Sequence, residues 1–218
     1  MNLSEFIEFT NSEQYYLNAN LSCIHIASET SNIQNLYFDF LLDMDFGLEK
    51  PVKQKWRLRA NNCEFIYNMT SKFLLPYIQI KLYTTHPLLW SYNSKQIDCQ
   101  LQGFPKNQDL FLGELYQSYI KVSKNWIQAS KDFSAIEYAY KNKGLKNLTI
   151  PFQLKTSIET ICNNHQIEFT VIKTKDSYPK ENKKMQALIF TNDYVSPDNF
   201  NMGQPYILAE SFTIENLQ

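Results

Sequence analysis

The sequence predicts an α+β protein with a largely antiparallel sheet. The first half of the chain alternates apolar and polar residues with period two, which is typical of strands with one buried face. After residue 106 apolar residues recur every three or four positions, which is typical of a helix. Short alternating segments then return. We therefore expect a β-meander in the N-terminal half, and two to three helices followed by two to three strands in the C-terminal half.

The clearest alternation runs from Leu36 to Ala60 and predicts two strands joined by a loop at Gly47–Pro51. Folding the chain about Glu49 brings opposite charges together on one face and apolar residues together on the other. The predicted facing pairs are Asp45 with Lys53, Asp43 with Lys55 and Asp39 with Arg59, and Phe46 with Val52, Leu42 with Trp56 and Phe40 with Leu58.

Asn61 and Asn62 then predict a two-residue turn, because asparagine tolerates positive φ. The segment from Cys63 to Met69 continues the alternation and would form the third strand of a meander. In that arrangement Glu64 lies opposite Arg59.

The remaining elements follow from the same two periods. Short helical turns are expected within residues 3–17. Further strands are predicted at 21–27, 77–83, 97–101, 167–171, 185–190 and 206–214. Helices are predicted from Asn107 to about Trp126, from Ser134 to about Lys143, and from Pro151 onward. The apolar stripe of the first helix consists of Leu112, Leu115, Tyr116, Tyr119, Val122 and Trp126, and that of the third consists of Leu154, Ile158, Ile161 and Cys162. A boundary near 104 would separate a β-rich region, 1–104, from a helix-strand region, 105–218, unless the two form one continuous domain.

The charge balance argues for a protein partner. The net charge of -1 argues against bulk attraction to nucleic acid or to an anionic membrane. Residues 1–49 contain no Lys or Arg, and such asymmetry either marks a partner surface or cancels within the predicted hairpin.

The cysteines and the N-terminus indicate a cytoplasmic protein. The four cysteines are widely spaced and form no CxxC motif, so we expect buried free thiols in a reducing compartment. The N-terminus lacks a signal-peptide pattern, and no apolar stretch is long enough to cross a bilayer.

Motifs for cofactors, metals and catalysis are missing from the sequence. The five glycines are scattered, so no phosphate-binding glycine loop is formed, and no zinc motif or GxSxG serine occurs. Cys162 and His165 are interpreted as a core cysteine beside a surface histidine. We therefore expect no cofactor and no metal, and we assign no catalytic residue.

Three functions are considered on this basis. The first is a non-enzymatic interaction protein of the immunity, inhibitor or accessory-subunit type, which binds another protein. Its contact residues would be Tyr77, Lys81 and Tyr83 on one strand and Lys53, Lys55, Arg57 and Arg59 on another. The second is an enzyme or small-molecule-binding protein with a pocket near His86 and Trp90. The third is a metal-dependent nuclease, based on Gln79-Ile80-Lys81 with Glu64 upstream.

Overall fold

The structure is a computed structural model, and it describes residues 1–16, 18–47, 50–70, 74–76, 79–127, 136, 144–176, 184–191 and 204–217. The chain divides into two compact units. Unit 1 comprises Met1–Thr84 and Lys183–Gln218, and unit 2 comprises Thr85–Asn182. Each unit has its own antiparallel sheet, so the predicted α+β class is confirmed.

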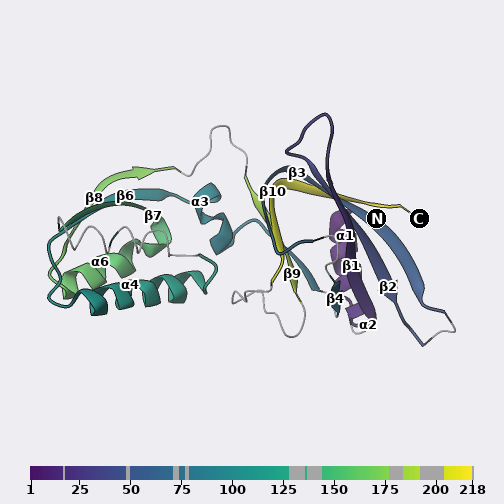
Figure 1. Ribbon diagram of the computed structural model, residues 1–218, viewed down its shortest axis with the longest axis horizontal. Helices are drawn as coiled ribbons and strands as arrows, with labels where there is room; N and C mark the ends of the chain where they lie inside the picture. Colours follow the sequence, from purple (N-terminus) through teal and green to yellow (C-terminus); the bar gives the residue numbers. More distant parts are fainter. Residues whose placement is uncertain are drawn as a thin grey trace. The chain divides into compact units, whose positions relative to one another are not determined.

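Unit 1 is built on a seven-stranded antiparallel sheet, sheet A, in the order β4-β1-β2-β3-β10-β9-β5 (Figure 1). Its strands are β1 Ala19–Ser28, β2 Leu36–Met44, β3 Val52–Tyr67, β4 Leu74–Pro76, β5 Gln79–Tyr83, β9 Gln186–Thr191 and β10 Tyr206–Asn216. The strands predicted at 21–27, 185–190 and 206–214 are confirmed as β1, β9 and β10. The strand predicted at 77–83 is seen from residue 79, and residues 77 and 78 lie outside the described residues.

One face of sheet A carries the core of unit 1. The buried residues of β2 and β3 on this face alternate along each strand, as the sequence predicted. They are Phe38, Phe40, Leu42, Met44, Trp56, Leu58 and Ala60. Helix α1, Leu3–Asn11, packs on this face, and its Phe6 ring lies 4.8 Å from the ring of Trp56. Asn2 caps α1 through a capping box, and the short helix α2, Glu13–Tyr16, follows.

The β2–β3 hairpin forms, but its register differs by two residues from the predicted one. Strand β2 ends at Met44 because the Asp45 N–H donates to the carbonyl of Asn18 (2.8 Å). The Asp45 carboxylate then accepts the N–H of Gly47 (2.9 Å), which starts the loop early, so the predicted fold about Glu49 is wrong. A shift of two leaves every side chain on its predicted face. The observed pairs include Asp39 with Arg57, Asp43 with Lys53, Phe40 with Trp56, and Met44 with Val52.

Asn61 and Asn62 do not form the predicted turn. β3 continues through both residues, and its second half, the predicted third strand, pairs with β10. Asn62 does adopt positive φ (46°), but its amide donates to Glu210 on β10 (2.8 Å), which holds the chain in the sheet. Glu64 lies in a bulge against β10 and does not face Arg59.

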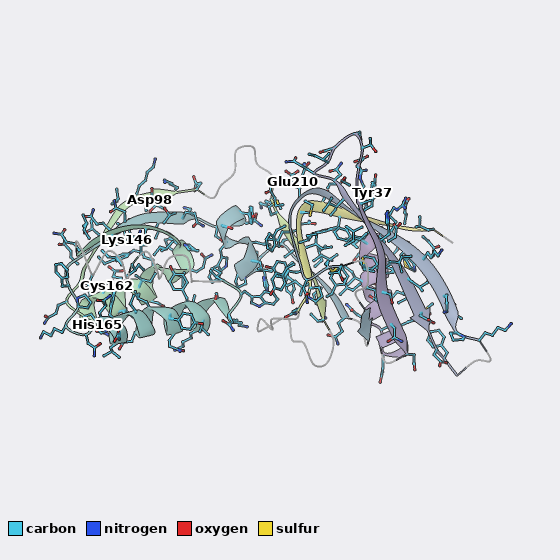
Figure 2. The ribbon with its side chains drawn as sticks, in the orientation of Figure 1. Tyr37, Asp98, Lys146, Cys162, His165 and Glu210 are labelled. Carbon is cyan, nitrogen blue, oxygen red and sulfur yellow. The ribbon has the colours of Figure 1, made fainter. Side chains whose placement is uncertain are left out.

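Unit 2 contains the three-stranded antiparallel sheet B, in the order β7-β6-β8, with α4 and α6 together on one face (Figure 1). Its elements are the 3-10 helix η1 Pro87–Leu89, α3 Trp90–Asn93, β6 Gln96–Gln102, α4 Gln108–Ser123, β7 Leu145–Pro151, the 3-10 helix η2 Phe152–Leu154, α6 Lys155–Asn164 and β8 Glu168–Lys175. The buried side of β6 consists of Ile97, Cys99 and Leu101. Cys162 of α6, labelled in Figure 2, belongs to the same core.

The helical predictions in unit 2 are partly confirmed. Asn107 caps α4 as predicted, because its Oδ1 accepts the N–H of Leu110 (3.0 Å). The buried face is rotated from the predicted stripe, since Tyr116 is exposed. The residues that α4 buries are Phe111, Leu115, Tyr119 and Ser123. The helix predicted from 134 to 143 lies outside the described residues apart from Ile136, which is buried.

The third predicted helix is also present, although Pro151 does not open it. Pro151 ends β7, which was not among the predicted strands, and η2 then leads into α6. Leu154, Ile158 and Cys162 are buried as predicted. The strands predicted at 97–101 and 167–171 are confirmed as β6 and β8.

Unit 2 is an insertion between two neighbouring strands of sheet A. β5 and β9 pair antiparallel with Tyr83 opposite Ala187, and the residues of unit 2 lie between them in the sequence. The boundary suggested near residue 104 falls between β6 and α4, which share the core of unit 2.

Candidate functional site

The sequence-predicted basic residues of β3 lie on the face of sheet A that is opposite the core. We call this surface the polar face, and it is centred on Tyr37, which is labelled in Figure 2. It consists of His25 and Glu29 from β1 and its following loop, Tyr37, Asp39 and Asp43 from β2, and Lys53, Lys55, Arg57 and Arg59 from β3. These side chains share one face because they occupy alternate positions of paired strands.

Asp39 is the central acid of the polar face. Its two carboxylate oxygens accept hydrogen bonds from Nε and Nη2 of Arg57, at 2.7 and 2.9 Å. His25 Nδ1 lies 3.4 Å from the same carboxylate. The hydrogen bonds from Arg57 lower the pKa of Asp39, although burial opposes them. The pair is therefore a bidentate, ordered ion pair of the kind that fixes geometry as well as charge.

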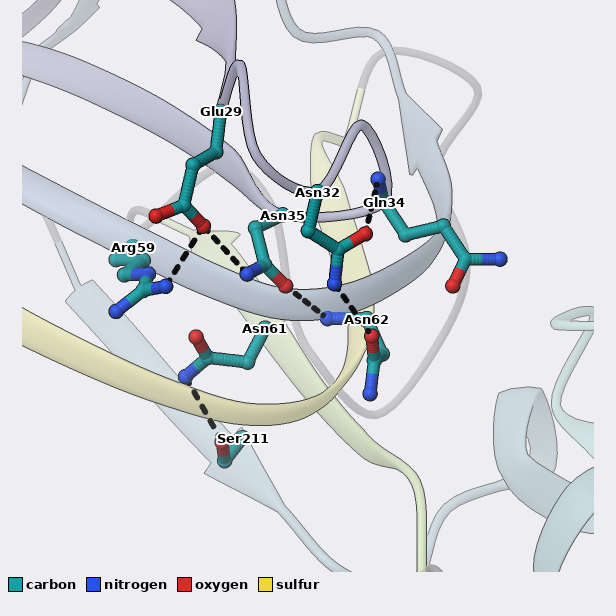
Figure 3. A network of polar contacts seen from close by, with 8 residues as sticks. All are labelled: Glu29, Asn32, Gln34, Asn35, Arg59, Asn61, Asn62 and Ser211. Carbon is teal, nitrogen blue, oxygen red and sulfur yellow. Dashed lines mark hydrogen bonds and ion pairs between the residues drawn. The ribbon is translucent and has the colours of Figure 1, made fainter.

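Glu29 forms the second ion pair, and a network of asparagines holds it (Figure 3). Its Oε2 accepts from Nδ2 of Asn35 (2.6 Å) and from Nη2 of Arg59 (2.7 Å), and these two hydrogen bonds lower the pKa of Glu29. The Oδ1 of Asn35 accepts the N–H of Asn62 (3.0 Å), and the carbonyl of Gln34 accepts the N–H of Cys63. The loop after β1 is thus tied to β3 by side chains and backbone together.

Tyr37 lies beside both guanidinium groups. The Cζ atoms of Arg57 and Arg59 are 5.4 and 5.8 Å from the centre of its ring, within range of a cation–π interaction. The side chains of Arg57 and Arg59 are 35% and 38% exposed, so they remain accessible although their charges are paired. Tyrosine and arginine are among the residue types that contribute most to binding energy at protein interfaces.

Lys53 and its neighbours are held more loosely. Lys53 Nζ lies 3.2 Å from Asp43, and both side chains are substantially exposed. Exposed pairs of this kind contribute only about 0–1 kcal/mol. Lys55 is exposed as well. The ordered part of the polar face is therefore the group that we call the Tyr37 cluster, which consists of Glu29, Tyr37, Asp39, Arg57 and Arg59.

Lys81 and Tyr83 do not lie beside the basic residues of β3. They lie on β5, which is three strand spacings, or about 14 Å, from β3, because β10 and β9 lie between the two strands. Tyr77 lies outside the described residues.

His86 and Trp90 make contacts within unit 2. His86 is buried, its Nδ1 accepts the N–H of Leu88 (3.3 Å), and its ring packs edge-on against Trp126 at 4.7 Å. The carbonyl of Trp90 accepts from the amide of Gln96 (2.6 Å), and the Trp90 ring packs on the core. A ligand pocket at these residues stays a prediction.

A groove of about 1140 Å³ lies along α4 and α6, and neither His86 nor Trp90 lines it. Its lining includes Gly113, Glu114 and Lys121 of α4 and Thr160 of α6. Glu114 also lies 3.0 Å from Nε2 of His165.

The Cys162–His165 pair does not form a nucleophile and base. Cys162 is buried, and burial raises the pKa of its thiol to about 12. His165 contacts Glu114 and Phe111, and its side chain is only 10% exposed, so its interpretation as a surface residue is wrong. Burial likewise raises the thiol pKa of Cys23, Cys63 and Cys99 to about 11; Cys63 is half-buried, and the other two are buried.

Only some of the residues of the polar face could be predicted from the sequence. Arg57 and Arg59 were predicted site residues, whereas Tyr37, Glu29 and Asn35 were not. The alternation places Tyr37 on the solvent-facing side of the sheet, but its position opposite Arg59 and near Arg57 depends on the register. Glu29 and Asn35 come from a loop, where no period applies.

Within the described residues, no group of three or more His, Cys, Asp or Glu side chains could hold a metal ion. No helix in the described part of the chain is long and apolar enough to span a bilayer. No protein-family model matches the chain, and neither a curated protein nor a solved structure is significantly similar to it.

Proposed function

We propose that this chain is a non-enzymatic protein-interaction protein of the immunity, inhibitor or accessory-subunit kind, and that it binds its protein partner through the polar face. The observation that supports this most is the Tyr37 cluster, in which two guanidinium groups lie within cation–π range of one aromatic ring and each is paired with a carboxylate. Because these side chains are held by ion pairs before binding, they would lose little conformational entropy on contacting a partner.

The balance of charge favours a protein partner over nucleic acid. Asp39 and Glu29 already neutralise Arg57 and Arg59, so the face offers little net attraction to phosphates. A protein surface with interspersed acidic, basic and aromatic groups suits it better. We further propose a reducing compartment such as the cytoplasm, which the four free cysteines support.

Affinity capture from the native cell tests the proposal. The chain should retain one stoichiometric protein, and Tyr37→Ala should weaken that complex by about 30-fold or more, as expected for an interface hot spot. Tyr116→Ala is the matched control, because Tyr116 is an exposed tyrosine on α4, outside the polar face. Equal capture by Tyr37→Ala and the unaltered chain would reject the polar face, and capture of no protein would reject the function.

A further inference from the structure

Strand β8 forms one edge of sheet B, and its outer side is unpaired among the described residues. The sheet order is β7-β6-β8, so β6 is the only described strand that pairs with β8. The strand is eight residues long and exposes two β-branched apolar residues at its middle, Val171 at 38% and Ile172 at 59%. A long edge with exposed apolar residues is a template for pairing with another strand.

Four polar residues of β8 share one face of the sheet. Glu168, Thr170, Lys173 and Lys175 pair with Gln102, Gln100, Asp98 and Gln96, which are alternate residues on the polar side of β6. Thr170 and Lys173 are three positions apart, which in a regular strand would place their side chains on opposite faces. A register shift between them, with Ile172 as the extra residue, keeps all four polar residues on the same face.

This arrangement makes the β8 sequence complementary to itself when it is run antiparallel. Placing Val171 opposite Ile172 of a second copy brings Glu168 opposite Lys175 and Thr170 opposite Lys173 of that copy. The two residues of each facing polar pair then lie on the same face of the joined sheet. Because the two copies are related by a two-fold axis, each contact occurs twice.

Two of the charged residues that this pairing brings together, Glu168 and Lys173, make no ion pair in the described part of one chain. Glu168 accepts a long hydrogen bond from Thr170 (3.4 Å). Lys175 contacts Asp98, and the carboxylate of Glu168 from a second copy would lie on the same face, between Lys175 and the diagonal Lys173.

We infer that two copies of this chain associate through antiparallel pairing of their β8 edges. The two copies of sheet B become one continuous sheet, with Val171 and Ile172 of both copies at its centre. The backbone groups of β8 supply the hydrogen bonds, and the residues at positions 168 and 175 fix the register.

Analytical ultracentrifugation of the full chain tests this inference. The unaltered chain should be dimeric at about 100 μM, a concentration that reports affinities in the micromolar range. Ile172→Lys should give a monomer with an unchanged circular dichroism spectrum, because a charge then lies at the centre of the paired edges. The matched control is Leu145→Lys on β7, the opposite edge of sheet B, where Leu145 is 43% exposed; it should remain dimeric.

The register has its own test. Glu168→Lys places lysine against Lys175 of the second copy and should weaken association by about tenfold or more. Raising the salt concentration should reduce the difference in dimer affinity between Glu168→Lys and the unaltered chain, because salt screens the repulsion between the two lysines. A monomeric unaltered chain, or a dimer that Ile172→Lys leaves intact, would overturn the inference; a dimer that only Leu145→Lys disrupts would assign the contact to β7.

Discussion

Individual side chains replace backbone hydrogen-bond partners at several points of unit 1. The carbonyl oxygen of the Asn35 side chain accepts the N–H of Asn62, at a place where the ladder between β2 and β3 has already ended. Asn62 in turn adopts positive φ, a conformation that asparagine tolerates better than most residues. The path of β3 and the position of Glu29 on the polar face both depend on these few amide groups.

Two glycines of unit 2 should respond to alanine with opposite signs. Gly113 lies within α4 with no atom within 4 Å of an added Cβ, so Gly113→Ala should stabilise the protein by about 0.5–1 kcal/mol through helix propensity. Gly144 has φ +60°, and an added Cβ would meet Phe104 at 2.5 Å. Gly144→Ala should therefore destabilise by about 1–2 kcal/mol or more.

Urea unfolding of both glycine variants measures these changes. The two variants serve as controls for each other, since both add one methyl group to the same unit. A lower free energy of unfolding for Gly113→Ala would contradict the prediction, because it would mean that a methyl group beside α4 disturbs the folded structure.

The Asp39–Arg57 pair should make stability depend on pH in the acid range. The pKa of Asp39 is lowered in the folded protein from its ordinary 3.8, chiefly by the hydrogen bonds from Arg57. As the pH falls, the Asp39 carboxylate is therefore protonated first in the unfolded chain. The contribution of the ion pair to the free energy of unfolding is complete above about pH 5 and is lost as the pH falls below about 4.

The free energy of unfolding of the unaltered chain and of Asp39→Asn should accordingly converge as the pH is lowered from 6 to about 3. Asp43→Asn, on the same strand face, is the matched control for loss of a carboxylate. A constant difference between the unaltered chain and Asp39→Asn over this range would contradict the prediction.

At the level of whole elements, α1 covers part of the β5 edge of sheet A. The side-chain amide of Asn11, the last residue of α1, donates to the carbonyl of Ile80 (2.9 Å) and accepts its N–H (2.8 Å). Ile80 lies in β5, the edge strand, so one asparagine takes the place of a neighbouring strand at that position. Covering an edge in this way prevents unwanted pairing with other chains.

Asn11→Ala should destabilise the protein by about 1–3 kcal/mol, because it leaves the N–H and the carbonyl of Ile80 without their partner. Asn11→Asp keeps the acceptor but removes the donor, and it should cost less than the alanine variant if the N–H of Ile80 is the group that matters more. Thermal unfolding with circular dichroism measures both. A neutral Asn11→Ala would mean that water replaces the amide.

The elements themselves were largely predictable because their patterns are local. The alternation in β2 and β3 located both strands and assigned each residue to the correct face. It could not fix the register, because shifts of two residues preserve the faces and Asp45 leaves the ladder through a contact with Asn18. The turn predicted at Asn61 failed for a similar reason, since β10, which holds β3 in the sheet there, lies about 150 residues further along the chain.

Helix faces show the same limit. The cap at Asn107 is a contact within four residues, and it was predicted correctly. The buried side of α4 depends on sheet B and differs from the predicted stripe, which included the exposed Tyr116. Strand β7 was missed because its alternation is short and runs directly into Pro151 and the helical segment after it.

The whole molecule consists of two units with separate cores. The core of unit 1 contains residues from both chain segments of that unit, whereas the core of unit 2 lies entirely between Ile97 and Ile167. Unit 2 therefore holds all the residues of its own core in one continuous segment, which is the usual condition for independent folding.

A fragment comprising residues 85–182 should fold alone and unfold cooperatively. The complementary polypeptide joins Thr84 to Lys183 through a short glycine linker, and it should retain sheet A because Tyr83 already pairs with Ala187. Dispersed amide signals in nuclear magnetic resonance spectra of each polypeptide measure the outcome. A fragment 85–182 without such dispersion would show that unit 2 depends on unit 1.

The pairing of Tyr83 with Ala187 also makes the chain suitable for domain exchange. Paired residues of neighbouring strands lie about 5 Å apart, so any small domain with adjacent termini can be fitted at this point in place of unit 2. A fluorescent reporter domain grafted there would leave the Tyr37 cluster unaltered in its own sheet. The unit that carries the polar face would then bear an exchangeable domain whose signal reports on that unit.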